Sequence, residues 1–251
     1  MSVERLADAL REAAPAVVLT GAGVSTESGI PDFRSPTGIW ARYDPTEYGS
    51  IQAFRSDPER VWEFYGPRYR MLTQAEPNAA HHAIAELQRR GLVGTLVTQN
   101  IDRLHERAGS RDVIEVHGSI RTATCPACGR VHALEEVLDL IEDGAPSCLE
   151  CATVIKPDVV FFGELLPAGA MERASEVAAA ARLLLVVGST LEVYPVAGLP
   201  LATVRAGGQV AIVNRGPTAF DGRAAIRIDG SAGATLTRVV DLVAEGNTMQ
   251  R

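Results

Sequence analysis

Short, continuously apolar segments alternate with helical patterns along most of this chain. Segments of this kind, rich in β-branched residues, are typical of strands that are covered on both faces. We expect strands at residues 16–20, 92–98, 113–116, 159–162, 183–187, 209–214 and 224–228, and helices at 78–90, 168–181, 195–205 and 232–244. This alternation predicts an α/β fold built on a doubly wound parallel sheet.

Two segments interrupt the alternation and predict a smaller inserted domain. Residues 35–77 contain turn signals, aromatic residues and one helix, for which Ser56 and Glu59 have capping-box spacing and Pro58 sits near the start. Residues 122–154 hold all four cysteines. Because ligands of open α/β sheets bind at the carboxyl ends of the strands, we expect the site between the sheet and these inserts.

Composition and charge exclude several classes of protein. The net charge of the 251 residues is −7, which argues against broad binding to nucleic acid or to an anionic membrane. No apolar run reaches the roughly 18 residues that cross a bilayer, and the first residues have no signal-peptide core. We therefore expect a cytoplasmic protein that binds neither membranes nor nucleic acid.

The cysteines form two closely spaced pairs. Cys125 and Cys128 are followed, after 19 residues, by Cys148 and Cys151. Two CxxC turns at such a spacing are typical of a four-thiolate zinc site, which is structural because no position stays open for water or substrate. The alternatives are four unbound thiols or a redox-active CxxC pair.

A glycine-rich turn follows the first predicted strand. Gly21 and Gly23 match a G-x-G pattern, but Thr26 stands where the dinucleotide fingerprint has its third glycine. At a strand-to-helix turn, such glycines let backbone N–H groups approach a phosphate at the helix N-terminus. On its own the pattern also fits an ordinary tight turn.

Polar residues follow several other predicted strands. They are Thr98 to Asp102 (TQNID), His117, Gly188 to Thr190 (GST) and Asn214. His117 ends an apolar strand and is followed by a glycine that gives it room, so it is a candidate general base. We expect His81, His82, His105 and His132 to be ordinary helix or surface residues.

Taken together, these segments resemble the sirtuin family of NAD-dependent protein deacylases. The resemblance rests on GAGVSTESGIPDFR, TQNID, EVHGS, the paired CxxC motifs, KPDVVFFGE and VVGSTLEVYP, which span nearly the whole chain in the family's order. It implies a Rossmann-like NAD-binding domain made of residues 1–34, 78–121 and 155–251. It also implies a helical insert at 35–77, with the cofactor loop and acyl pocket, and a zinc-binding insert at 122–154.

The resemblance also implies the site residues. The positions that match the family's NAD contacts are Gly21, Ala22, Gly23, Ser25, Asp32, Phe33, Arg34, Gln99, Asn100, Ile101, Asp102, Gly188, Ser189, Asn214 and Ala232. The implied catalytic residues are the base His117 together with Asn100 and Asp102. Val159, Val160, Phe161, Phe162, Gly163 and Glu164 match the segment that pairs with the backbone of a substrate peptide.

The implied reaction transfers an acyl group from a protein lysine to NAD. Its products are nicotinamide, an O-acyl-ADP-ribose and free lysine, and zinc is a structural ion. We expect a monomer whose partners are acylated-lysine proteins. The competing readings are a mono-ADP-ribosyltransferase with the same first step, an NAD-dependent dehydrogenase and a non-enzymatic zinc-ribbon module.

Two further comparisons with the family refine this expectation. Tyr65 and Arg68, three residues apart, resemble the signature of the desuccinylase branch, in which a phenol and a guanidinium grip an acyl carboxylate. The alternative is an amphipathic helix with Tyr65 in the core and Arg68 in solvent. The chain departs from the family at Ser189 and Thr190, where Thr-Ser is common, and at Gly216, where an acidic residue is common.

Overall fold

A parallel sheet of six strands forms the centre of the larger lobe in the computed structural model, which describes residues 3–248. The strands are β1 (Ala16–Thr20), β2 (Val93–Thr98), β3 (Val113–Glu115), β7 (Leu183–Val187), β8 (Gln209–Val213) and β9 (Ile226–Ile228). They lie in the order β3-β2-β1-β7-β8-β9. This is the doubly wound order, so the predicted fold class is confirmed.

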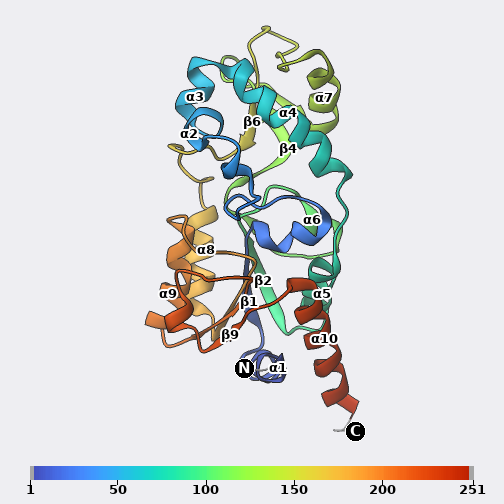
Figure 1. Ribbon diagram of the computed structural model, residues 1–251, viewed down its shortest axis with the longest axis vertical. Coiled ribbons are helices and arrows are strands. Elements are labelled where there is room, and N and C mark those ends of the chain that lie inside the picture. The colour runs from blue at the N-terminus through green and yellow to red at the C-terminus, as the bar shows by residue number, and fades with distance from the viewer. Residues whose placement is uncertain (1–2, 249–251) are drawn as a thin grey trace.

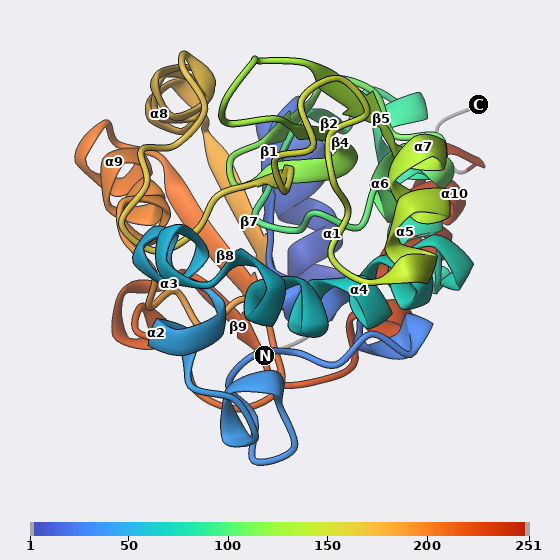
Figure 2. The ribbon, with the colours of Figure 1, turned by 90° about the horizontal axis from the view of Figure 1, so that it is seen from above.

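Helices cover both faces of this sheet, as Figure 2 shows. The first face packs against α1 (Val3–Ala13), α5 (Ala79–Arg89) and α10 (Ala232–Thr248), and the other against α8 (Ala170–Ala180) and α9 (Leu199–Arg205). Val18 of β1 belongs to the first core and its neighbours Val17 and Leu19 to the second. Because side chains alternate along a strand, the continuous apolar run fills both cores.

The smaller lobe lies above the carboxyl ends of the strands (Figure 1). Its antiparallel sheet has the order β5-β4-β6, with β4 (Gly118–Thr124), β5 (Val131–Ala133) and β6 (Lys156–Val159). Its helices are α2 (Pro45–Tyr48), α3 (Ile51–Ser56), α4 (Pro58–Gln74) and α7 (Leu134–Leu140). A third core, which includes Trp62, Tyr69 and Phe161, holds these elements together.

Short elements complete the described chain. They are α6 (Leu104–Arg107) and the 3-10 turns η1 (Ala22–Val24), η2 (Thr26–Ser28), η3 (Ile39–Ala41), η4 (Ile141–Asp143), η5 (Val196–Gly198) and η6 (Asp221–Arg223). Among residues 3–248 there is no helix with the length and apolar character needed to span a membrane.

Two local predictions were wrong. The segment 159–162 does not join the parallel sheet, because β6 ends at Val159 and pairs with β4 in the antiparallel one. Val159 and Phe161 enter the core of the smaller lobe, whereas Phe162 is exposed, although the apolar composition is that of a strand buried in the main sheet. The cap of α4 is Asp57, whose side chain accepts the N–H of Arg60, and Ser56 ends α3 instead.

Candidate active site

The turns after β1 and β7 meet backbone to backbone at the point where the strand order reverses. The Gly23 N–H donates to the Gly188 carbonyl at 2.9 Å. A Cβ on Gly23 would lie 2.9 Å from that carbonyl oxygen, and a Cβ on Gly188, at φ +63°, would lie 2.2 Å from the Val24 nitrogen. The glycines therefore allow two strand-end turns to close together at the ligand-binding edge of the sheet.

The chain after β1 differs from the predicted strand-to-helix turn. Two 3-10 turns, η1 and η2, stand where a regular helix was expected, and Gly29 ends the second of them in a left-handed conformation. Glu27 of η2 reaches α10, where its Oε1 accepts the Ser231 hydroxyl at 2.7 Å and the Gly233 N–H at 3.2 Å. The first turn of α10, with Ala232 as its first residue, is thus already capped by a carboxylate.

A buried polar network links the glycine-rich turn to the TQNID segment. The Ser25 hydroxyl donates to Asp102 Oδ2 at 2.7 Å and accepts from Asn100 Nδ2 at 3.1 Å. The Leu104 N–H donates to Asp102 Oδ1 at 2.9 Å. Burial raises the pKa of Asp102, and the hydrogen bonds from Leu104 and Ser25 oppose this shift. The structure thus brings together three residues that the sequence analysis assigned to the site.

Two histidines that were expected to be ordinary helix or surface residues belong to this network or border it. His81 Nδ1 accepts the Asn78 N–H at 3.2 Å, so its Nε2 carries the proton and faces Ser25 Oγ at 3.4 Å. The His105 ring lies 4.7 Å from His81, and its Nε2 is 2.9 Å from Thr20 Oγ1. Both side chains are buried, as is His132, which contacts Glu136 in the smaller lobe; only His82 of the four is exposed.

The predicted base lies at the junction of the two lobes. His117 Nδ1 is 3.0 Å from the Gln99 carbonyl, which can only accept, so Nδ1 carries the proton and Nε2 keeps a lone pair. Burial lowers the pKa of His117, the hydrogen bond to Gln99 opposes the shift, and the charge of Arg34 adds to it. The imidazole is therefore neutral at pH 7 and able to accept a proton through Nε2.

Gln99 also joins the ends of β2 and β7, the two strands that flank β1. Its Nε2 donates to the Ser189 hydroxyl at 3.0 Å. This hydrogen bond links the turn after β2 to the turn after β7. Ile101, two residues after Gln99, packs against the core of the smaller lobe. The TQNID segment thus connects both lobes and the β7 turn.

The loop with Asp32, Phe33 and Arg34 borders a cleft. Asp32 Oδ1 accepts the N–H groups of Arg34 and Ser35, and Arg34 pairs with Glu192 at 3.3 Å. The cleft has a volume of about 480 Å³ and is lined by Phe33, Arg34, Ser35, Pro36, Trp40, Ala41, Pro45 and Phe162. It is thus walled mainly by this loop and by aromatic side chains.

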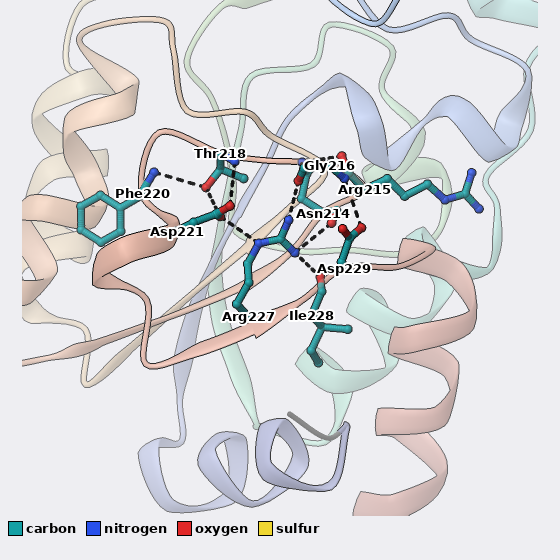
Figure 3. Close-up of polar contacts among 9 residues, drawn as sticks. All are labelled: Asn214, Arg215, Gly216, Thr218, Phe220, Asp221, Arg227, Ile228 and Asp229. Atoms are coloured by element: carbon teal, nitrogen blue, oxygen red, sulfur yellow. Dashed lines mark hydrogen bonds and ion pairs between the residues drawn. The ribbon is translucent and has the colours of Figure 1, made fainter.

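A clamp that the sequence analysis missed fixes the loop after β8 (Figure 3). Arg227 of β9 donates to the carbonyls of Asn214 (2.9 Å), Ile228 (2.5 Å) and Gly216, and its Nε pairs with Asp221 at 2.8 Å. Asn214 Nδ2 in turn donates to the Gly216 carbonyl at 3.2 Å. An arginine inside an apolar strand, with an aspartate six residues earlier, is the signal that could have indicated this clamp.

Tyr65 and Arg68 lie on α4, which continues through Pro67. The Arg68 guanidinium stacks 3.3 Å above the centre of the Phe64 ring and donates to the Phe64 carbonyl at 2.5 Å. Its Nε is buried and has no partner in the described chain. Burial lowers the pKa of Arg68 and raises that of Tyr65, whose ring packs 5.2 Å from Phe161.

The segment assigned to the substrate peptide is already partly paired. The N–H groups of Val160 and Phe162 donate to the carbonyls of His117 and Gly49, and the Phe161 N–H donates to Glu164 Oε2 at 2.8 Å. Lys156, the only lysine in the sequence, pairs with the same carboxylate oxygen at 3.0 Å. Within residues 3–248, the N–H groups of Gly163 and Leu165 have no recorded partner.

The four cysteines, which lie in the sequence between β4 and β6, come together in space. The sulfur atoms of Cys125, Cys128, Cys148 and Cys151 all lie within 4.8 Å of one another, and two of the pairs, Cys125–Cys151 and Cys128–Cys148, are 3.4 and 3.6 Å apart. Sulfurs around a tetrahedral zinc ion, at Zn–S of about 2.3 Å, stand about 3.8 Å apart. The cluster therefore fits one structural zinc ion held by four thiolates.

The fold and the site define a Rossmann-type dinucleotide-binding protein. Its smaller lobe, which holds the four cysteines, lies over the edge of the sheet where the strand order reverses. Residues 21–195 match the Sir2 family. A protein named NAD-dependent protein deacylase 2, from Pyrobaculum aerophilum, is 44% identical over 95% of this chain and 94% of its own length. The NAD-dependent protein deacetylase of Sulfurisphaera tokodaii is 44% identical over 100% of this chain and 99% of its own.

The structure of Sir2Tm bound to a propionylated peptide superposes with a TM-score of 0.88, at 40% identity and covering 98% of this chain and 99% of that one. The chain belongs to the Sir2 family. The predicted class, an NAD-dependent protein deacylase with NAD as co-substrate, is confirmed.

Proposed function

We propose that this deacylase removes succinyl and malonyl groups, in addition to acetyl, from lysines of other proteins. One observation carries the acyl specificity: the half-buried guanidinium of Arg68 has a buried Nε donor without a partner. A buried, unsatisfied donor on a cation costs free energy, and an acyl carboxylate would relieve that cost. Tyr65, one turn earlier on α4, places a hydroxyl on the same helix.

The deacylation would use the residues that lie where the strand order of the main sheet reverses. NAD, when bound, would supply a ribose carbon to which the acyl oxygen bonds as nicotinamide leaves, and with the uptake of one water molecule the products would be O-acyl-ADP-ribose and free lysine. His117 would take a proton from a ribose hydroxyl through Nε2, because Nδ1 is held by the Gln99 carbonyl. Asp102 would hold the nicotinamide amide, and Asn100, fixed by Ser25, would orient the ribose.

The remaining NAD contacts would follow the matched positions. Gly21, Ala22 and Gly23 would face the phosphates, Asp32, Phe33 and Arg34 would cover the cleft, and the adenosine would lie along Gly188, Ser189, Asn214 and Ala232. The substrate backbone would pair with the segment 159–164 near the N–H of Gly163, which stays available.

The proposal includes the organisation of the chain. The Rossmann-like domain would comprise 1–34, 78–121 and 155–251, with inserts at 35–77 and 122–154. The smaller sheet does not follow these bounds, because β4 crosses the boundary after residue 121 and β6 lies within 155–251. We also propose that the protein acts as a cytoplasmic monomer without nucleic-acid or membrane partners.

The test compares kcat/KM for acetyl- and succinyl-lysine peptides in the wild type, Arg68→Met and Arg70→Met. A charge-assisted pair is worth about 2–3 kcal/mol, so Arg68→Met is expected to reduce succinyl turnover about 30- to 150-fold, and acetyl turnover far less. Arg70, an exposed residue on the same helix, is the matched control.

Mass spectrometry of the peptide separates the outcomes. Equal losses of acetyl and succinyl turnover in Arg68→Met would refute the specificity but not the deacylase. Deacylation by His117→Ala at the wild-type rate would refute the assigned base, and a gain of ADP-ribose on the peptide would favour the transferase alternative.

A further inference from the structure

Asp229 presents an open carboxylate at the ligand-binding edge of the sheet. It directly follows β9, and its Oδ1 accepts the Gly216 N–H at 3.1 Å. Figure 3 shows its carboxylate beneath the loop that begins at Asn214, the residue that follows β8. No other described residue has a recorded hydrogen bond or ion pair with Asp229, and the side chain is exposed.

The other carboxylates around this loop are already engaged. Asp221 accepts the Thr218 hydroxyl at 2.6 Å and pairs with Arg227. Glu27 accepts the Ser231 hydroxyl and the Gly233 N–H at the start of α10. Asp229 therefore keeps one oxygen available to a ligand, whereas Asp221 and Glu27 hold the protein together.

The loop that carries the Gly216 N–H is held rigidly in place. Arg227 binds its carbonyls at Asn214 and Gly216 and ties them to Asp221. The position of the Asp229 carboxylate is therefore fixed from two sides, by the end of β9 and by this loop. A group fixed in this way loses little conformational entropy when a ligand binds.

We infer that Asp229 accepts a hydrogen bond from the adenosine ribose of NAD and selects NAD over its 2′-phosphorylated form. The inference rests on the proposed placement of the adenosine along Gly188, Ser189 and Asn214. In dinucleotide-binding folds, a carboxylate at a strand end binds the ribose hydroxyls of NAD, whereas an arginine accommodates a 2′-phosphate. The carboxylate of Asp229 would repel that phosphate.

Arg215, which directly follows Asn214, is a cation that could favour a phosphate. Its side chain extends away from Asp229 and Asn214 in Figure 3, whereas the Asp229 carboxylate points toward the loop. The guanidinium of Arg215 thus points away from the Asp229 carboxylate.

Isothermal titration calorimetry with ADP-ribose and 2′-phospho-ADP-ribose tests the inference without turnover. Asp229→Asn is the informative variant because its amide oxygen can still accept the Gly216 N–H, while the charge is lost. We expect the wild type to prefer ADP-ribose by at least tenfold. Asp229→Asn is expected to bind ADP-ribose about fivefold to tenfold more weakly and to lose most of that preference.

Asp139→Asn, at an exposed position of α7, controls for the loss of one surface charge. Unchanged affinities in Asp229→Asn, an equal loss for both ligands, or a wild type that binds both equally well would each overturn the inference. Failure of the wild type to bind ADP-ribose at all would instead count against the proposed adenosine site.

Discussion

Burial of His81 in its neutral form predicts a loss of stability as the pH falls below 7. The ring is fully buried; its Nδ1 accepts the Asn78 N–H that caps α5, and Nε2 faces Ser25. Protonating Nδ1 would break the cap and place a charge in the core. Burial, followed by the charge of His82, lowers the pKa of His81 from 6.5 to about 4.

The sign and size of the effect follow from linkage. Since the folded-state pKa is depressed, the stabilisation is fully present above pH 6.5 and is lost as the pH falls toward 4. Between pH 7 and pH 5 the unfolded chain takes up a proton at this site and the folded chain does not, which costs about 2 kcal/mol. For a chain of this size the melting temperature is expected to fall by about 4–8 °C. Burial also lowers the pKa of His105, so that residue adds a change of the same sign.

His81→Gln removes the titrating group but keeps the cap, because a glutamine at the third helical position can accept the same N–H. Urea unfolding followed by circular dichroism at pH 7 and pH 5 should show that this variant loses about 2 kcal/mol less than the wild type. His82→Gln, at the exposed neighbouring position, should keep most of the wild-type loss, because burial and not the charge of His82 is the main cause of the lowered His81 pKa. Equal losses in His81→Gln and the wild type would refute the reasoning.

Three further predictions concern the metal, a glycine and the clamp. Zinc removal by a chelator, or Cys128→Ser, should unfold the smaller lobe and abolish deacylation, while the main sheet stays folded. Hydrogen exchange with and without added zinc measures this difference between the lobes. Gly188→Ala combines a left-handed φ with a collision and should cost about 3 kcal/mol or more, whereas Gly207→Ala, at φ +90° in open space, should cost about 1–2 kcal/mol in the same thermal melts. Arg227→Met should lose about 2–3 kcal/mol in urea unfolding and raise the KM for NAD more than it lowers kcat, whereas Arg238→Met, an exposed position, should change stability by less than about 0.5 kcal/mol.

The main sheet could be predicted because both faces of its central strands are covered by apolar side chains. Residues 16–20 and 183–187 are buried throughout, so their composition alone identifies them as central strands. The segment 159–162 has the same composition, but Val159 and Phe161 enter a different core, and no local property of the sequence separates the two cases. The smaller sheet depends on pairing between β4 and β6, whose partners are more than 30 residues apart.

The site was predictable where chemistry requires particular residues in a short segment, as with the two cysteine pairs. Contacts between distant segments were not. His81 is 56 residues from Ser25, and Asp229 is 13 residues from Gly216, so neither contact leaves a pattern in the sequence. A histidine at the start of an amphipathic helix has the same local signal whether it faces solvent or a buried serine.

His81 and His117 show why the geometry decides the chemistry. Burial keeps both rings neutral at pH 7, and in both Nδ1 meets a backbone group. At His81 that group is an N–H, so Nδ1 accepts and the proton stays on Nε2, which can only donate to Ser25. At His117 it is the Gln99 carbonyl, so the proton stays on Nδ1 and Nε2 is left as an acceptor. Two neutral imidazoles in one site thus differ in tautomer, and only His117 can act as a base through Nε2, because its backbone partner is an acceptor.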